Sequence, residues 1–177
     1  MKLSLIFLSI KNVPKTNWSS DTPLNFKPKL KTFILLCLGL SLFGFGESLL
    51  IHSTIGVSPW TVLAEGISLK LHWSVGFATF IVSVMVLSSW IFLKQKPGLG
   101  TLLNIIIIAG TIDLSLFLFD FSTNNLLLNV LTGILGVLFV GLGSGIYLIA
   151  NLGPGPRDGL MTGLQRITKF PIAWVRA

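Results

Sequence analysis

An internal repeat constrains this 177-residue chain more than any other feature of its sequence. The segment from Gly44 to Gly66 recurs imperfectly from Gly141 to Gly163, 97 residues further on. Because glycine and proline fix the shape of a backbone, the repeated object is a shape: a glycine-rich helix end, a tight turn, and a helix opened by proline. Repeats of this kind occur in many transporter folds. The matched residues of the first copy are Gly44, Gly46, Gly56, Pro59 and Gly66.

Both copies lie in a sequence whose composition suits a lipid bilayer. Hydrophobic residues make up 52% of the chain and charged residues 11%, with a mean hydropathy of +0.85. Soluble proteins carry about 25% charged residues. The net charge of +7 comes from basic residues that flank apolar runs, which is the pattern of membrane proteins rather than of nucleic-acid binding. We therefore expect the lipid bilayer as the main partner and no nucleic-acid partner.

Four apolar runs are long enough to cross the hydrocarbon core, which takes about 20 residues of helix. They cover approximately 32–53, 75–93, 101–119 and 126–150, and a fifth run begins near Pro171. Segments 58–73 and 155–169, each led by a proline, are too short and polar to cross and predict short interfacial or re-entrant helices. The predicted domains are a cytoplasmic N-terminal tail, 1–31, and a transmembrane domain, 32–177. The fold class expected is therefore all-α, a polytopic transmembrane helix bundle.

Basic residues predict how the spans are oriented. They gather before the first run, after the second and after the fourth, and the cytoplasmic side of membrane proteins is enriched in them. The N-terminus is then cytoplasmic, the first Gly-Pro turn is outside and the second is inside. Since three spans separate equivalent points, the repeats, about 32–120 and 126–177, are predicted to be inverted. Each complete repeat would hold about three spans and one short helix. Ala177 is equivalent to Phe80, so we expect the second repeat to be truncated at its C-terminus.

Two acids within the apolar runs are candidate ion or substrate sites. Glu47 and Asp113 each follow a glycine by three residues, and Asp113 is expected past the middle of its span. Charged groups at such depths cost about 2.5–3.5 kcal/mol on insertion scales, so each needs a reason. One reason is a proton or cation site. The alternative is a structural acid that accepts hydrogen bonds from serine, threonine or backbone groups.

The string from Gly153 to Gly159 is the most distinctive in the chain. Arg157 and Asp158 open its helix and are candidates for binding an anion at the helix start. Alternatively, Asp158 completes the helix end and pairs with Arg157. The first-repeat equivalent of Arg157 is Trp60, which we interpret as an anchor at the outer interface. The residues expected to shape the two turns are Gly56, Pro59, Gly153 and Pro156.

Catalytic and metal-binding patterns are weak in this sequence. His52 and His72 have no Cys, Glu or His at metal-ligand spacing. No serine lies in a nucleophile motif with a suitable histidine. We therefore expect no metal, no cofactor and no enzyme activity.

Three strings give the chain a resemblance to a known family. They are Ile55-Gly-Val-Ser-Pro-Trp60, Lys96-Pro-Gly-Leu-Gly-Thr-Leu-Leu-Asn104 and Leu152-Gly-Pro-Gly-Pro-Arg-Asp-Gly-Leu-Met161. Residues 32–177 resemble the YczE-like family of bacterial integral membrane proteins, related to the YitT type. The resemblance implies a multi-pass protein of the bacterial plasma membrane, and members that continue past the C-terminus of this chain.

The sequence leaves several functions open. An inverted repeat with broken helices and buried acids favours a transporter-like protein for a small solute or ion. An accessory or scaffold membrane protein, or an inactive truncated copy, would explain the same packing features. Other copies of the same chain, in a homo-oligomer, are among the partners considered, and the substrate is unknown.

Overall fold

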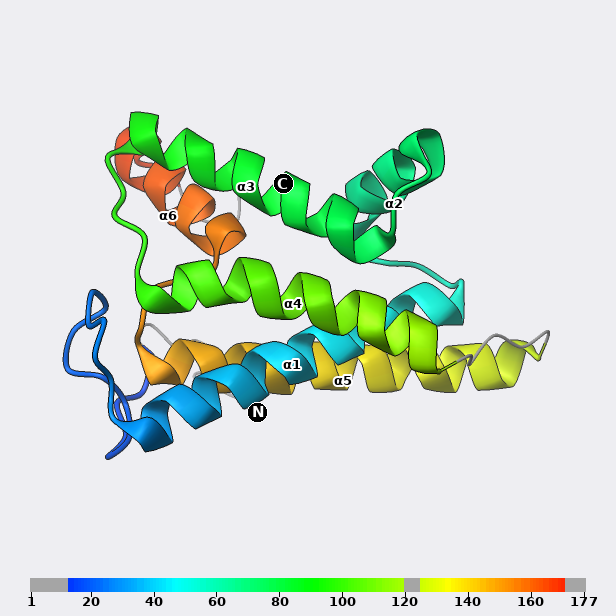
Figure 1. The fold of residues 1–177 in the computed structure, drawn as a ribbon, viewed down its shortest axis with the longest axis horizontal. Helices are drawn as coiled ribbons and strands as arrows, with labels where there is room; N and C mark the ends of the chain where they lie inside the picture. The colour runs from blue at the N-terminus through cyan, green and yellow to red at the C-terminus, as the bar shows by residue number, and fades with distance from the viewer. Residues whose placement is uncertain (1–12, 120–124, 171–177) are drawn as a thin grey trace, which may run out of the picture.

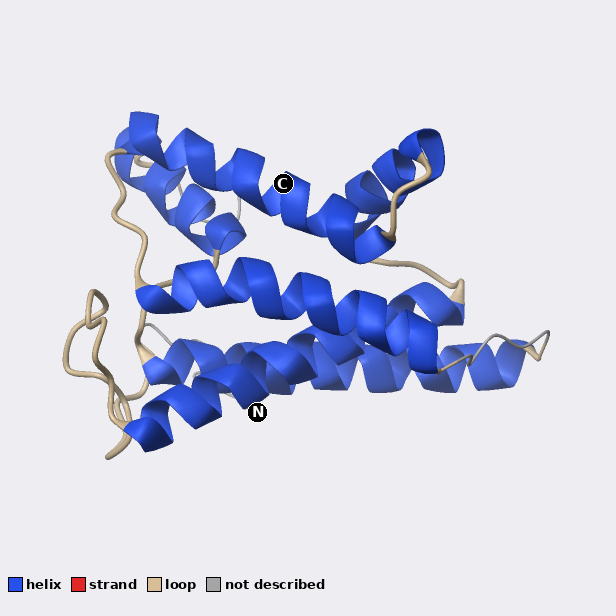
Figure 2. Cartoon of the chain, viewed as in Figure 1, coloured by secondary structure: helices blue, strands red, loops and turns tan. Residues whose placement is uncertain are grey.

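The computed structural model describes residues 13–119 and 125–170, and in these ranges it contains six α-helices and no strand (Figures 1 and 2). This confirms the predicted all-α fold. The helices are α1 (Leu30–Ser53), α2 (Pro59–Leu71), α3 (Val75–Leu93), α4 (Leu99–Leu118), α5 (Leu126–Ala150) and α6 (Pro156–Thr168).

Four of these helices, α1, α3, α4 and α5, are long and apolar enough to cross a membrane. Their bounds agree with the four predicted runs to within two residues. Helices α2 and α6 are the two short, proline-led helices that the repeat predicted. The run expected near Pro171 lies outside the described residues.

Local sequence explains where the short segments begin and end. The Ser58 hydroxyl accepts a hydrogen bond from the Thr61 N–H at 3.3 Å, and Pro59 occupies the first position of α2, where a missing N–H costs nothing. Ser74 caps α3 in the same way. Pro156 opens α6 after Gly153, whose φ of +107° is a conformation that suits glycine alone.

Helices α1 and α5 pack against each other through glycines. A Cβ atom added to Gly46 would lie 2.7 Å from the Val140 nitrogen, and one added to Gly143 would lie 2.5 Å from the Phe43 nitrogen. Backbones can approach this closely only where side chains are absent, as at many helix contacts in membranes. Helix α4 also packs on α1, so these three helices form one layer (Figure 1).

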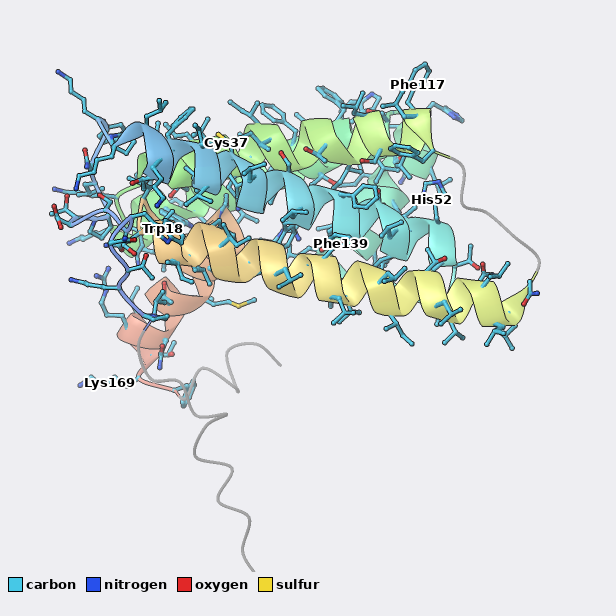
Figure 3. The ribbon with its side chains drawn as sticks, turned by 90° about the horizontal axis from the view of Figure 1, so that it is seen from below. Trp18, Cys37, His52, Phe117, Phe139 and Lys169 are labelled. Atoms are coloured by element: carbon cyan, nitrogen blue, oxygen red, sulfur yellow. The ribbon has the colours of Figure 1, made fainter. Side chains whose placement is uncertain are left out.

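Helix α3 lies on the other side of α4, with α2 and α6 at its two opposite ends (Figure 1). Helix α6 packs on the C-terminal half of α3, where Gly159 faces the Trp90 ring and the Trp90 Nε1–H donates to the Pro156 carbonyl at 3.0 Å. Lys169, after α6, lies at the end of the bundle that also holds Trp18, whereas His52, near the end of α1, lies at the other (Figure 3). The two short helices therefore sit at opposite ends of the bundle.

The described part of the N-terminal tail is held against the bundle. The Ser20 N–H donates to the Ala150 carbonyl at 3.0 Å, and the Asn151 side chain donates to the Ser20 carbonyl at 2.8 Å. The Thr32 hydroxyl donates to the Trp18 carbonyl at 2.6 Å. These bonds join the tail to the start of α1 and the end of α5.

Candidate functional site

A cavity of about 650 Å3 lies between α1, α5, the start of α2 and α6. Phe43 and Val140, which line it, are within two residues of the midpoints of α1 and α5, so the cavity lies at mid-height in the bundle. A smaller cavity of about 180 Å3 shares Phe43, Arg157 and Asp158 with it. The larger cavity is lined by Phe43, Glu47, Ser58, Pro59, Trp60, Val140, Arg157, Asp158, Leu160, Met161 and Leu164.

Glu47 is the buried acid of this cavity. Its side chain is 3% exposed, and its Oε2 accepts a hydrogen bond of 2.7 Å from the Thr61 hydroxyl, itself 2% exposed. The Thr61 hydroxyl also lies 2.8 Å from the Ser58 hydroxyl. Since Thr61 has one hydroxyl proton and gives it to Glu47, Ser58 donates to Thr61. The first turn of α2 is therefore connected to Glu47 through a chain of two hydroxyl groups.

Arg157 supplies the positive charge of the cavity. Its guanidinium lies 5.6 Å from the centre of the Trp60 ring, a cation–π contact between equivalent residues of the two repeats. Within residues 13–119 and 125–170, no hydrogen-bond acceptor contacts this guanidinium. Burial lowers the pKa of Arg157, and the negative charges of Glu47 and Asp158 offset only part of this decrease. An arginine stays protonated in proteins, so the cavity holds a permanent cation.

Asp158 is engaged by α5. The hydroxyl of Tyr147, which is 3% exposed, donates a hydrogen bond to the Asp158 carboxylate. Asp158 also lies in the first turn of α6, where a negative charge is stabilised by the helix dipole. The bond that joins α5 to α6 is thus formed by Asp158, while Arg157 faces Trp60.

Asp113 lies away from the cavity. It is five residues before the end of α4, past the middle of the helix. Its carboxylate accepts hydrogen bonds from the Ser74 hydroxyl at 2.5 Å and the Gly76 N–H at 2.6 Å. Both donors belong to the start of α3. The structure therefore separates the two predicted acids and gives Asp113 the contacts of a structural acid.

The predicted turn residues differ in how tightly they are packed. Around Gly153, the Leu152 carbonyl accepts from the Gly100 N–H at 2.7 Å, and the Pro154 carbonyl accepts from the Thr101 hydroxyl at the same distance. A Cβ atom at Gly56, in contrast, would meet nothing within 4 Å. The second turn is therefore fixed on the start of α4, and the first turn is open.

Sequence reasoning did not assign Thr61, Trp60 and Tyr147 to a common site. Thr61 lies in the segment 58–73, whose polarity was visible in the sequence and was the one available signal for this residue. Trp60, interpreted as an interfacial anchor, lines the cavity. No group of three metal-ligating side chains is found in the part of the chain that the structure describes.

An all-helical bundle with four membrane-spanning helices and a charged cavity at mid-height defines a polytopic integral membrane protein. Comparison with known proteins agrees with this class.

The chain belongs to the family of unknown function DUF6198, whose model matches residues 30–177. It is 37% identical over 168 residues to an uncharacterized protein of Haemophilus influenzae, which covers 95% of this chain and 76% of that protein. It is 31% identical over 140 residues to the uncharacterized membrane protein YczE of Bacillus subtilis, which covers 78% of this chain and 65% of YczE. The resemblance to the YczE-like family is thereby confirmed. No solved structure matches the chain.

Proposed function

We propose that this protein is transporter-like and moves a small solute or ion across the bacterial plasma membrane through the central cavity. The observation that carries the proposal is the contact between Trp60 and Arg157, 5.6 Å apart at the cavity wall. Each is the second residue of a proline-led helix, and each is the repeat equivalent of the other.

This contact supports an inverted relation between the two repeats. In inverted-repeat transporters, discontinuous helices from the two halves meet near the midplane of the membrane and form the substrate site. Here α2 and α6 lie at opposite ends of α3, and both begin at the same cavity (Figure 1). A pseudo-two-fold axis between Trp60 and Arg157 would produce this arrangement. The distribution of basic residues supports an N-terminus on the cytoplasmic side.

The cavity has the size and chemistry of a small-molecule site. Ligand sites commonly have volumes of about 300–1,000 Å3 and combine apolar walls with a few polar groups. The cavity of about 650 Å3 combines three charged side chains, Glu47, Arg157 and Asp158, with walls such as Phe43 and Leu160. Charged groups inside a membrane bundle mark solute or proton pathways in many transporters.

Flux through proteoliposomes tests the proposal. Liposomes containing the full chain and a pH-sensitive dye would be exposed to a panel of carboxylates, amino acids, sugars and inorganic ions. We expect one class of solute to drive flux that falls at least about tenfold, or 1.4 kcal/mol, in Glu47→Gln and Arg157→Gln. The matched control is Lys70→Gln, on the exposed surface of α2.

Flux that survives in both cavity variants would contradict the proposal. So would a folded, reconstituted protein that moves none of the solutes, and that outcome would favour an accessory or scaffold role.

A further inference from the structure

Arg157 has the features of a residue that awaits an anion. The side chain is half-buried, its guanidinium rests on the Trp60 ring, and its five N–H donors meet no acceptor among the described residues. The planar fork of a guanidinium matches a carboxylate, sulfonate or phosphate in two parallel hydrogen bonds. The cation–π contact with Trp60 uses none of the guanidinium N–H donors, so they stay available for an anion.

Glu47 is the buried acid that shares the cavity with this cation. Asp158 already accepts the hydroxyl of Tyr147, whereas Glu47 is bonded through only one of its two oxygens within the described part of the chain. With Glu47 ionised, the three charged side chains of the cavity sum to one negative charge, which opposes the entry of another anion.

The environment of Glu47 is compatible with both of its protonation states. The Thr61 hydroxyl donates to the carboxylate and can equally accept from a carboxylic acid, because a hydroxyl group is both donor and acceptor. Around Glu47, α2 contributes Glu65, whose pKa is raised by burial and by Glu47, and α6 contributes Arg157 and Asp158. Helix α5 contributes only the apolar Val140 to the cavity, and on α1 itself His52 lies five residues further on.

We infer that the cavity binds a small organic anion with an apolar part, and that the anion binds together with one proton on Glu47. This inference deepens the proposed function and rests on it. A hydronium ion gives its proton to the Glu47 carboxylate, and the negative group of the solute accepts hydrogen bonds from the Arg157 N–H donors, which no described acceptor occupies. One proton and one negative charge then enter the site together. The apolar body of the solute faces walls such as Phe43, Met161 and Leu164.

Direct binding in detergent tests this inference without depending on flux. Benzenesulfonate is the probe, because it stays ionised throughout the pH range used and only the protein titrates. Its dissociation constant would be measured by calorimetry at about pH 5 and about pH 8.5, on either side of the window in which buried carboxyl groups titrate. We expect wild-type binding to weaken at least about tenfold at the higher pH, and each anion bound to take up a proton in weak buffer.

Variants separate the roles of the two residues. Glu47→Gln should bind benzenesulfonate about equally at both pH values, because its side chain is neutral throughout. Arg157→Gln should bind at neither, Arg157→Lys should bind weakly, and Lys70→Gln should behave like wild type. Melting temperatures of all variants show which of them remain folded, and Arg157→Lys gives the test of the cation if Arg157→Gln does not fold.

The outcomes distinguish this inference from the proposed function. Binding that is independent of pH in the wild type, or that keeps its pH dependence in Glu47→Gln, would overturn the inference. Phosphate binding as tightly as benzenesulfonate would overturn the requirement for an apolar part. The expected binding pattern without flux would support the anion site and refute transport. Flux of a neutral or cationic solute that depends on Glu47, without anion binding, would leave transport standing and refute the anion site.

Discussion

Replacing Gly159 by alanine tests the contact that holds α6 on α3. A Cβ atom at Gly159 would lie 1.9 Å from Cζ2 and 2.4 Å from Cη2 of Trp90. Carbon atoms in contact are normally about 3.5–4 Å apart, so either α6 must move away or the ring must leave its site. The ring cannot leave freely, because Trp90 is 2% exposed and its Nε1–H donates to the Pro156 carbonyl.

Three contributions set the magnitude of the effect. Overpacking costs about 1–3 kcal/mol, and a displaced indole N–H costs about 1 kcal/mol more. Alanine in place of glycine within a helix stabilises that helix by about 1 kcal/mol. The net loss for Gly159→Ala is therefore about 1–3 kcal/mol. Gly66→Ala is the matched control, because Gly66 lies in the equivalent short helix α2 and a Cβ atom there would meet nothing within 4 Å.

Thermal unfolding in detergent, followed by size-exclusion chromatography of heated samples, measures the difference. Gly66→Ala should be as stable as wild type or up to about 1 kcal/mol more stable, so the two variants should differ by about 1–4 kcal/mol, or about 2–16 °C. Adding Trp90→Leu should make the alanine at position 159 nearly neutral, since the clash is with the ring. Equal melting of the two glycine variants would show that α6 does not pack on Trp90 as described.

Two further predictions concern Asp113 and the orientation of the chain. Asp113→Asn keeps one acceptor for the start of α3 and should cost about 1 kcal/mol in detergent stability. Asp113→Leu leaves the N–H of the buried Gly76 and the hydroxyl of the exposed Ser74 without this acceptor, and should cost about 1–3 kcal/mol more. Loss of anion binding in a stable Asp113→Asn variant would contradict a purely structural role. In intact cells of a variant without the native cysteine, a cysteine at Lys70 should react with an impermeant reagent and one at Arg166 should not, because the distribution of basic residues predicts that α2 lies outside and α6 inside. The reverse labelling would refute the proposed topology.

Hydropathy and turn chemistry were sufficient to predict the elements of this fold. The four spanning helices follow from runs of apolar residues, and the start of α2 follows from Ser58 and Pro59, whose effects are local. The role of Asp113 was harder to predict, because the sequence of one helix does not show which neighbouring helix starts beside it. In the structure Asp113 binds the start of α3, and this long-range contact decides its role.

The candidate site could be predicted only in part. The sequence identified Glu47 as an acid in an apolar run and Arg157 as a cation at a helix start, but they are far apart in the chain, and no local rule places them in one cavity. The repeat identified Trp60 and Arg157 as equivalent residues. Equivalence does not imply contact, and only the packing of α2 and α6 brings the two side chains together.

The difference between Trp60 and Arg157 has a physical reason if the repeats are inverted as proposed. Near a two-fold axis a side chain faces its own counterpart. The backbone conformation can be the same in both repeats, but a charged side chain at this position would face a like charge. Two guanidinium groups at the 5.6 Å that separates Arg157 from the Trp60 ring would repel by about 3 kcal/mol at an effective dielectric constant of about 20. An aromatic ring opposite an arginine turns this repulsion into a cation–π attraction. The glycines and prolines of the two repeats can therefore stay identical, whereas these two positions have to differ.

Exchanging the two residues tests this reasoning. Trp60→Arg alone should lower the melting temperature, because it places two cations together beside Glu47, and one of them lacks a ring to rest on. The double variant Trp60→Arg with Arg157→Trp restores one cation and one ring with their positions reversed. It should recover at least half of the lost stability, since an approximate axis allows the pair to be formed from either side. If the exchange is no more stable than Trp60→Arg, the two sides of the cavity are not equivalent, and the contact at its centre does not reflect a two-fold relation between the repeats.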